Sequence, residues 1–200
     1  MVAIDGSNRS STLKAAETPT LFGAPFECES DYVAIPKVSS SNRKYIPVDY
    51  LSKEIIPGDK LFTMQGATIY HFGIITSNVH MAWMRAVCGR LKSDYSYSNT
   101  IVYNNFPWPT PTDAQKAKIE QTAQAILDAR ALYPDASLAD LYDEVTMPPE
   151  LRTAHQKNDV AVMQAYGFQC VGDDGKKHWL TEAETVAELM KMYQALTANQ

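Results

Sequence analysis

The chain has 200 residues, of which 45% are hydrophobic and 20% are charged, and its formal net charge is −5. This length suits one domain or two small ones with a hydrophobic core, and the composition is that of an ordinary globular protein. No apolar run is long enough for a membrane span, and the first residues contain no apolar segment of signal-peptide length, so we expect neither membrane insertion nor secretion.

The charges are unevenly distributed along the chain. Residues 33–92 carry eight Lys and Arg residues against three acidic residues, whereas residues 110–200 carry eight against fourteen. A local basic face is what a nucleic-acid partner needs, and an acidic total can hide one. An excess of this size over sixty residues is also within chance, so the distribution alone favours neither interpretation.

The first part of the chain alternates short strand signals with turn signals. Residues 1–19 are rich in Ser, Thr and Ala and are typical of a linker or of the tail of an upstream domain. Alternation of apolar and polar residues predicts strands over 31–37 and 44–51, separated by the turn SSSN, and a further strand over 60–65. Pro36 and Pro47 place the first two at edges or strand ends.

A helix is predicted over residues 77–88, because large apolar residues recur there at helical spacing. Ser77 is suited to cap its N-terminus, and Gly89 follows as a stop. Residues 90–103 return to strand character and end in TIVY, so we expect one strand there.

After the proline-rich segment that begins near Trp108, the pattern becomes helical. The predicted helices run from Thr112–Asp113 to Pro134, from Ser137 over SLADLYDEV, from Pro148 to Tyr166 with Gly167 as a stop, and from Thr181 with Glu184 in capping-box spacing. GDDGKK reads as a turn. The sequence therefore predicts an α+β fold, with a small mixed α/β domain over 20–109 and an all-helical domain over 110–200.

The motif NNFPWP, residues 104–109, is the best candidate for an enzyme site. DNA amino-methyltransferases use an Asn/Asp-Pro-Pro-aromatic loop, but here the second position differs. No Gly-x-Gly occurs, so no glycine-rich turn is available for S-adenosylmethionine. We interpret the motif as a structural join, with Phe106 and Trp108 packed between the two parts, and assign no catalytic or cofactor-binding residue.

The remaining polar clusters favour structural roles. The histidines are isolated from one another in sequence and predict no metal site, and Asp173–Asp174 lacks the ligand ladder of a calcium loop. The acidic run from Glu27 to Asp31 is typical of a solvated loop. Three widely spaced cysteines and the absence of CxxC indicate reduced thiols in a cytoplasmic protein. The cysteines are Cys28, Cys88 and Cys170, and the histidines are His71, His80, His155 and His178.

The stretch GRLKSDYSYSN, residues 89–99, has an unusual pattern. On one strand, Lys92, Asp94 and Ser96 would share a polar face, while the tyrosines would be buried on the other. Lysine can donate to guanine O6 and N7, and aspartate can accept from cytosine N4, so the pair could read one G·C base pair. The alternative is an exposed Lys–Asp ion pair, which the residues alone favour because such pairs are common. Nearby candidates for phosphate contacts are Arg43, Lys44, Arg85 and Arg90.

Three separated segments carry a family resemblance. They are DYVAIPKVSSSNRKYIPVDYL, the run from HFGIITSNVH to NNFPWP, and ILDARALYPDASLADLYDEVTMPPELRTAHQKNDVAVMQAYGF. In this order they resemble the C-terminal third of large bacterial DNA methyltransferases of the MmeI type, over residues 19–170. That family joins an N6-adenine methyltransferase, often with a nuclease, to a target-recognition domain and a C-terminal helical domain. The resemblance implies that Lys92 and Asp94 lie at base-reading positions, with Ser96 as a weaker candidate.

The resemblance also implies where the missing parts are. The cofactor site for S-adenosylmethionine and the catalytic loop would lie upstream in the same chain or in a separate subunit, and this chain would be the module that recognises double-stranded DNA. Whether it has any enzymatic activity of its own is left open. The alternative function is a helical protein-interaction or assembly module of a restriction-modification complex, without base reading.

Overall fold

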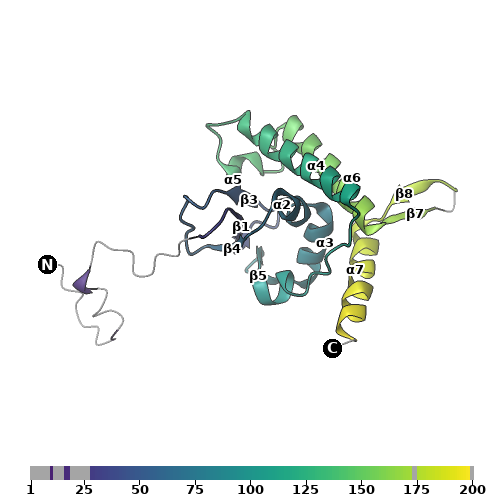
Figure 1. Cartoon of the computed structure of the whole chain (residues 1–200), viewed down its shortest axis with the longest axis horizontal. Coiled ribbons are helices and arrows are strands. Elements are labelled where there is room, and N and C mark those ends of the chain that lie inside the picture. Colours follow the sequence, from purple (N-terminus) through teal and green to yellow (C-terminus); the bar gives the residue numbers. More distant parts are fainter. Residues whose placement is uncertain (1–9, 11–15, 19–27, 173–174, 199–200) are drawn as a thin grey trace.

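The computed structural model describes residues 10, 16–18, 28–172 and 175–198. Most of the predicted N-terminal linker, the first residues of the predicted α/β domain, Glu27 and Asp173–Asp174 lie outside these ranges. In the described part, short strands and two helices come first and longer helices follow (Figure 1).

Two three-stranded antiparallel sheets form the first part. In one, β1 (Tyr32–Pro36) lies between β3 (Asp49–Leu51) and β4 (Leu61–Gln65). In the other, β6 (Asp94–Ser96) lies between β2 (Val38–Ser39) and β5 (Gly89–Leu91). The strands expected near 31–37 and 60–65 are confirmed. The strand expected over 44–51 forms only at its end, since Pro47 cannot donate to a ladder and the residues before it turn into the core.

Helix α3 (Asn78–Val87) is confirmed, and the Ser77 side chain accepts from the backbone N–H of His80 as its cap. Gly89 has no positive φ and starts β5 instead of capping the helix. Helix α2 (Ile69–Ile75) was not expected. Five of its seven residues are buried, so no polar face reveals its helical period in the sequence.

The single strand expected over 90–103 is wrong. The chain instead forms a tight hairpin of β5 and β6, followed by a π-helical turn, η1 (Asn99–Tyr103), which Ser98 caps at its N-terminus. The turn residues of this hairpin are Lys92 and Ser93. Serine is common in turns, but the first position needs a positive φ, which lysine rarely adopts. The hairpin reversal therefore gave only a weak signal in the sequence.

Helices dominate the second part, as expected. The predicted caps of α4, α6 and α7 are confirmed at Thr112, Gly167 (φ 70°) and Thr181. The α+β class is confirmed, although the second part also carries two unexpected antiparallel strands, one before and one after the undescribed residues 173–174, and α5 is shorter than expected. The elements are α4 (Asp113–Ala131), α5 (Leu138–Leu141), α6 (Pro149–Tyr166), β7 (Gln169–Val171), β8 (Lys177–Trp179) and α7 (Glu182–Thr197).

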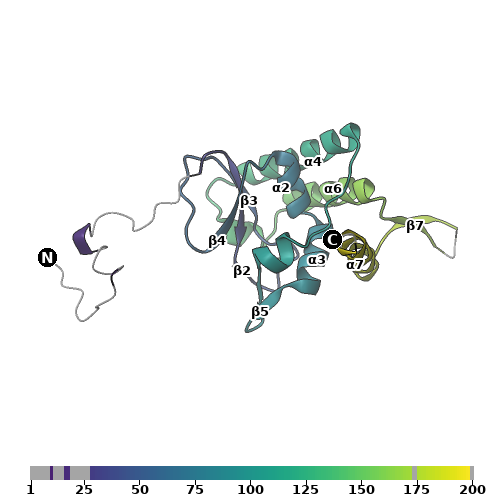
Figure 2. The same ribbon diagram turned by 60° about the horizontal axis from the view of Figure 1, so that its bottom comes forward.

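The two parts share one hydrophobic core. Helix α4 packs against α6 and α2, and α7 packs against α3 (Figures 1 and 2). The expected join at NNFPWP is seen for Phe106, whereas the ring contacts of Trp108 among the described residues are all with residues of the first part. The ring of Phe106 contacts that of His80 at 4.6 Å, between centroids, and the hydroxyl of Tyr166 donates to the carbonyl of Pro107 at 2.9 Å. The aromatic residues therefore tie α3 to α6.

Other sequence expectations can be compared with the described residues. Cys28, Cys88 and Cys170 are all free thiols. Within the described ranges, no group of three or more His, Cys, Asp or Glu side chains could hold a metal ion. Nor does any helix in those ranges have the length and apolar character needed to cross a membrane.

Candidate nucleic-acid interface

In the sheet β2–β6–β5, strand β5 lies away from α4 and α6, on the opposite side of α2 (Figures 1 and 2). Its hairpin pairs Leu91 with Asp94, so Lys92 and Ser93 form a two-residue loop. Lys92 has φ 57°, as the first loop residue of a primed hairpin turn requires. This conformation costs a non-glycine residue about 1 kcal/mol. The predicted shared strand face of Lys92 and Asp94 is therefore wrong, because a turn and not a strand brings them near each other.

The polar side chains of this hairpin are nevertheless at least partly exposed, with Lys92 exposed and Asp94 and Ser96 half-buried. Asp94 and Ser96 lie on the opposite face of β6 from Tyr95, which is buried with 7% exposure. Lys92 is exposed at the tip. Among the described residues, no hydrogen bond or ion pair engages the Lys92 amine or the Asp94 carboxylate. The alternative of a mutual ion pair is thus not formed, and both groups remain available to a ligand.

Two of the four predicted phosphate contacts flank the same sheet. The guanidinium of Arg90 lies 4.2 Å from the centre of the Tyr95 ring and donates to the carbonyl of Ser93 at 3.4 Å. Arg43 donates to the Ser39 hydroxyl at 3.4 Å, and Ser39 pairs with Tyr95 across the sheet. The structure therefore gathers both arginines around the hairpin that carries Lys92 and Asp94.

The other two candidates, Arg85 and Lys44, lie outside this sheet. Arg85, on α3, forms an ion pair with Glu182 at 3.2 Å and donates to the carbonyl of Lys44 at 2.6 Å. Its side chain is 21% exposed. Lys44 itself is exposed, and its amine lies 5.5 Å from the centre of the Tyr45 ring. Arg85 is thus already engaged within the chain, in contrast to Lys92.

A neighbouring cavity of about 320 Å³ was not apparent in the sequence. It opens between β4 and η1, and carboxamide side chains and aromatic rings line it together. The sequence indicates this cavity only through the aromatic and amide residues of SYSNTIVYNN. The β4 residues that complete its lining come from a distant part of the chain. The lining residues are Ile35, Phe62, Thr63, Met64, Gln65, Tyr97, Asn99, Tyr103 and Asn104.

Several polar groups are buried where the two parts of the chain meet. Arg130 of α4 pairs with Asp49 at 3.0 Å and donates to the carbonyl of Val48 at 2.7 Å. Its guanidinium also contacts the hydroxyl of Tyr142, which lies 2.7 Å from Nε2 of His155. We call this set, together with Asn158 and Asp159 of α6, the buried interface.

Burial perturbs the titration of these groups. Desolvation raises the pKa of Asp159 to about 6, although the Tyr45 hydroxyl and the Asn78 backbone N–H both donate to its carboxylate. Desolvation lowers the pKa of His155 well below its usual value, and the charge of Arg130 adds to this effect. Burial likewise lowers the pKa of His80 to about 3. These histidines are therefore neutral structural groups.

The described residues do not fit a site for S-adenosylmethionine. Every strand pairing among them is antiparallel, so no strand of a parallel sheet leads through a glycine-rich turn into a helix. That is the arrangement by which α/β folds bind nucleotide-like cofactors at a helix N-terminus.

Comparisons with known proteins agree on one family. The model of "MmeI, target recognition domain" matches residues 4–110, and the model of "MmeI, C-terminal domain" matches residues 111–200. DNA methyltransferase A of Bacillus subtilis is 38% identical over 186 residues, which are 93% of this chain and 20% of that protein.

A solved structure is also similar. It is that of the type IIL restriction-modification enzyme MmeI in complex with DNA, with 42% sequence identity and a TM-score of 0.83 over 96% of this chain and 25% of that one. The chain thus spans a quarter or less of the length of the relatives it matches. It belongs to the MmeI family and carries that family's target recognition domain followed by its C-terminal domain.

Proposed function

We propose that this chain is the module that recognises a specific sequence in double-stranded DNA for an adenine-N6 methyltransferase of the restriction-modification type. Its family, its similarity to a protein named a DNA methyltransferase and its similarity to a DNA-bound enzyme support this proposal. The observation that carries it is the β5–β6 hairpin, which presents an exposed lysine in its turn and a half-buried aspartate beside it, both without partners among the described residues.

In this proposal Lys92 and Asp94 read one G·C base pair. The Lys92 amine would donate to guanine O6 or N7, and the Asp94 carboxylate would accept from cytosine N4. A narrow two-residue turn can enter the major groove, which admits a two-stranded ribbon. Ser96 shares the exposed face of β6 with Asp94 and is a weaker candidate for an adjacent contact.

Phosphate contacts would fix the orientation of the hairpin on the duplex. We assign them to Arg43 and Arg90 beside the sheet and to Lys44 at the end of the preceding loop. Arg85 belongs to the same proposed set. Because its guanidinium is engaged with Glu182 and with the Lys44 carbonyl, we expect its neutralisation to act partly through that loop.

The catalytic part would lie in an upstream domain or in a partner subunit. It would hold S-adenosylmethionine, since the described residues of this chain do not fit that cofactor. The assembled protein would act in the cytoplasm, where bacterial DNA is found. The role of this chain would then be to position the target adenine relative to that catalytic part.

The test is selection from a randomised duplex library by this chain at low salt. We expect enrichment of one short motif that contains a fixed G·C pair. Retention that depends on salt, without enrichment, would show that the chain binds the backbone and cannot read bases by itself. Absence of any retention would contradict DNA recognition by the isolated module.

Substitution of the reading pair sharpens this test. Lys92→Ala or Asp94→Ala should relax preference at one position, at a cost of about 1–3 kcal/mol for that contact. Lys118→Ala, at an exposed lysine of α4, a helix that lies away from the β5–β6 hairpin in Figures 1 and 2, is the matched control and should leave the motif unchanged. A methylated sequence unaltered by both hairpin substitutions would refute the assignment.

A second candidate function is assembly without base reading. The observation in its favour is the acidic balance of residues 110–200, which carry fourteen acidic against eight basic residues and would repel DNA over much of their surface. This candidate predicts stable binding of the chain to a catalytic methyltransferase subunit, and no DNA retention at any salt concentration. A pull-down with that subunit, alongside the library selection, distinguishes the two functions.

A further inference from the structure

The loop that carries Arg43 and Lys44 has few backbone hydrogen bonds of its own. We call residues 40–46 the basic loop. Its local backbone bonding includes one turn, in which the N–H of Arg43 donates to the carbonyl of Ser40 at 3.3 Å. The Tyr95 hydroxyl reaches the carbonyl of Ser41 only at 3.5 Å, and the N–H of Ile46 has the weak acceptor Sδ of Met81 at 3.4 Å. The loop is therefore held at its end by the burial of Tyr45 and Ile46 in the core and elsewhere by side-chain contacts from other elements.

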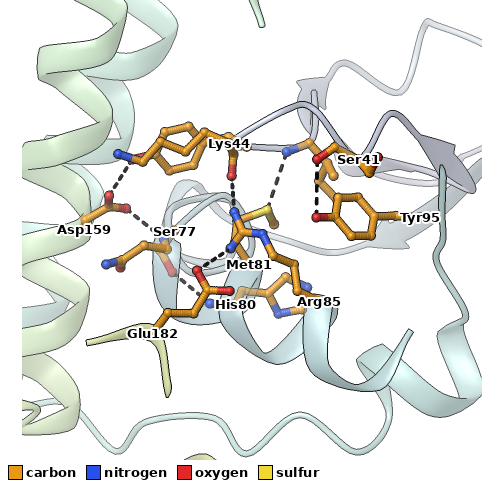
Figure 3. Close-up of polar contacts among 12 residues, drawn as sticks. Ser41, Lys44, Ser77, His80, Met81, Arg85, Tyr95, Asp159 and Glu182 are labelled. Atoms are coloured by element: carbon orange, nitrogen blue, oxygen red, sulfur yellow. Dashed lines mark hydrogen bonds and ion pairs between the residues drawn. The ribbon is translucent and has the colours of Figure 1, made fainter. Parts of the chain in front are cut away.

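One such contact comes from α7. Glu182, the first residue of that helix, forms the 3.2 Å ion pair with Arg85, and the other guanidinium nitrogen donates to the carbonyl of Lys44 at 2.6 Å (Figure 3). Arg85 thus bridges a carboxylate of the C-terminal part and the backbone of the basic loop. The glutamate orients the guanidinium that binds the loop.

A second contact comes from α6. The hydroxyl of Tyr45 donates to Oδ2 of Asp159 at 2.6 Å, and Oδ1 of the same carboxylate accepts from the N–H of Asn78 at 2.8 Å. The ring of Tyr45 stacks on that of His155 with centroids 4.2 Å apart. Asp159 is 8% exposed, so water cannot readily replace these hydrogen bonds. Figure 3 shows Asp159 of α6 and Glu182 of α7 next to the basic loop and α3.

We propose that Asp159 and Glu182 are positioning residues for DNA binding, which hold the basic loop through Tyr45 and Arg85 so that Arg43 and Lys44 meet the phosphates. This inference rests on the proposed function. A loop that is ordered before binding does not lose conformational entropy when it meets DNA, so its contacts contribute more fully to affinity. The C-terminal part would thereby influence DNA binding without touching DNA.

The chain offers a matched pair of substitutions for the test. Glu182 and Glu144 each pair with an arginine at 3.2 Å, and their side chains are 57% and 50% exposed. Only the arginine paired with Glu182 contacts the basic loop, because Arg152 binds the backbone of Glu144 instead. Glu182→Gln and Glu144→Gln therefore remove similar ion pairs, with and without a link to the loop.

Two quantities are measured on the whole chain: hydrogen exchange of the amides of residues 40–46 without DNA, and DNA affinity as a function of salt. For Glu182→Gln we expect faster exchange in the loop, affinity lower by roughly three- to tenfold, and a salt slope lower in magnitude by about one unit. Sequence preference should stay unchanged, because phosphate contacts carry no sequence information. Glu144→Gln should change none of these.

Asp159→Asn and Tyr45→Phe extend the test to the second contact. Both should speed exchange in the loop and lower the salt slope like Glu182→Gln. Tyr45→Phe removes a single oxygen from the chain, so it remains informative if Asp159→Asn fails to fold.

Three outcomes would overturn the inference. In the first, Glu182→Gln and Tyr45→Phe behave like Glu144→Gln in both measurements. In the second, the loop exchanges faster but the salt slope is unchanged, which would mean that the contacts order the loop and have no effect on DNA. In the third, the unsubstituted chain binds no DNA. This last result refutes the proposed function as well, and the exchange data then still report whether the two carboxylates order the loop.

Discussion

The buried interface and the β5–β6 hairpin are both rich in charged and polar side chains, but these groups are used in opposite ways. In the buried interface, Arg130 has three partners within the chain, and Asn158 donates to the carbonyl of Gly73 at 2.7 Å. At the hairpin tip, the exposed Lys92 and the half-buried Asp94 have no such partners among the described residues. Polar groups of the first kind stabilise the fold, and those of the second kind are free to bind a ligand.

This difference distinguishes charged groups that stabilise the fold from charged groups that can bind a ligand. A buried charged group must have its partners inside the chain, since an uncompensated charge there costs several kcal/mol. An exposed group has no such requirement, and its local geometry can even be unfavourable, as the positive φ of Lys92 shows. Substitutions in the two regions should therefore have different consequences: loss of stability in one, loss of DNA preference in the other.

The largest effect is expected from Arg130→Met, which keeps most of the side-chain volume and removes the charge. The carbonyl of Val48 and the hydroxyl of Tyr142 would lose their donor, and Asp49 would lose its ion-pair partner. We expect a loss of about 3 kcal/mol in the free energy of unfolding. Denaturant unfolding measures it. Arg152→Met, at a more exposed ion pair with Glu144, is the control and should lower the free energy of unfolding by about 1 kcal/mol or less. Equal losses would break the distinction between the two regions.

The pH dependence of stability is the next largest effect. His80 and His155 have lowered pKa values, so below about pH 6.5 the unfolded chain binds protons that the folded chain does not. Their contribution to stability is present above that pH and is lost on acidification. Asp159 acts in the opposite direction, because its pKa is raised to about 6 and the folded chain gains its proton first. The two histidines outweigh the single aspartate.

The free energy of unfolding should therefore fall by about 2–3 kcal/mol between about pH 7 and pH 5. Denaturant titrations at several pH values measure this fall. His80→Gln keeps a polar atom near the Tyr97 hydroxyl, which lies 3.0 Å from Nε2 of His80, and removes the titrating ring. The variant should show a smaller fall. A flat profile for the unsubstituted chain would contradict neutral burial of the histidines.

Gly73→Ala should destabilise by about 1–2 kcal/mol, since overpacking outweighs the gain in helix propensity. A Cβ atom at this position would lie 2.8 Å from Cγ2 of Ile119 and 3.0 Å from Cβ of Ala123. The Ala123 methyl cannot rotate away, so α2 and α4 would have to separate. Gly58→Ala, where nothing lies within 4 Å, is the control. Unchanged thermal unfolding of Gly73→Ala would show that the two helices are not closely packed here.

The smallest effect on stability is expected at the hairpin tip. Lys92→Gly relieves the positive φ and should be more stable than Lys92→Ala by about 0.5–1 kcal/mol. Both variants lack the amine, so both should lose preference at the same base pair. The midpoints of denaturant unfolding and the selected DNA motifs are the two measurements. Identical stability of the Gly and Ala variants would mean that the turn is not strained by its side chain.

The elements that were predicted correctly carry their signals locally. Helices α3, α4, α6 and α7 begin or end at caps that depend on neighbouring residues, such as the Thr181–Glu184 capping box and the left-handed Gly167. The missed elements have weaker signals. Helix α2 begins at the cap Thr68, but its partner His71 is not the Glu or Gln of the usual capping box, and the helix is buried on most of its surface. The β5–β6 turn has no Gly, Asn or Pro. The strand prediction over 90–103 failed for this second reason.

The candidate site was only partly accessible from the sequence. The residue types at Lys92 and Asp94 indicated base-reading chemistry, but the proposed strand geometry was wrong and the base-reading role remains a prediction. The phosphate candidates could not be separated from one another in the sequence. The structure distinguishes them, since Arg43 and Arg90 flank the hairpin and Arg85 is engaged with Glu182.

The sequence by itself determined the α+β class, the capped helices and the family, because these depend on local periodicity, caps and ordered motifs. Only the tertiary structure decided which charges are buried and which remain free. Asp49 and Val48, which bind Arg130, and the partners of Asp159 and Glu182 all lie more than seventy residues away along the chain. Contacts at such separations arise when the core closes and brings distant backbone and side-chain groups together, and no pattern of neighbouring residues specifies them.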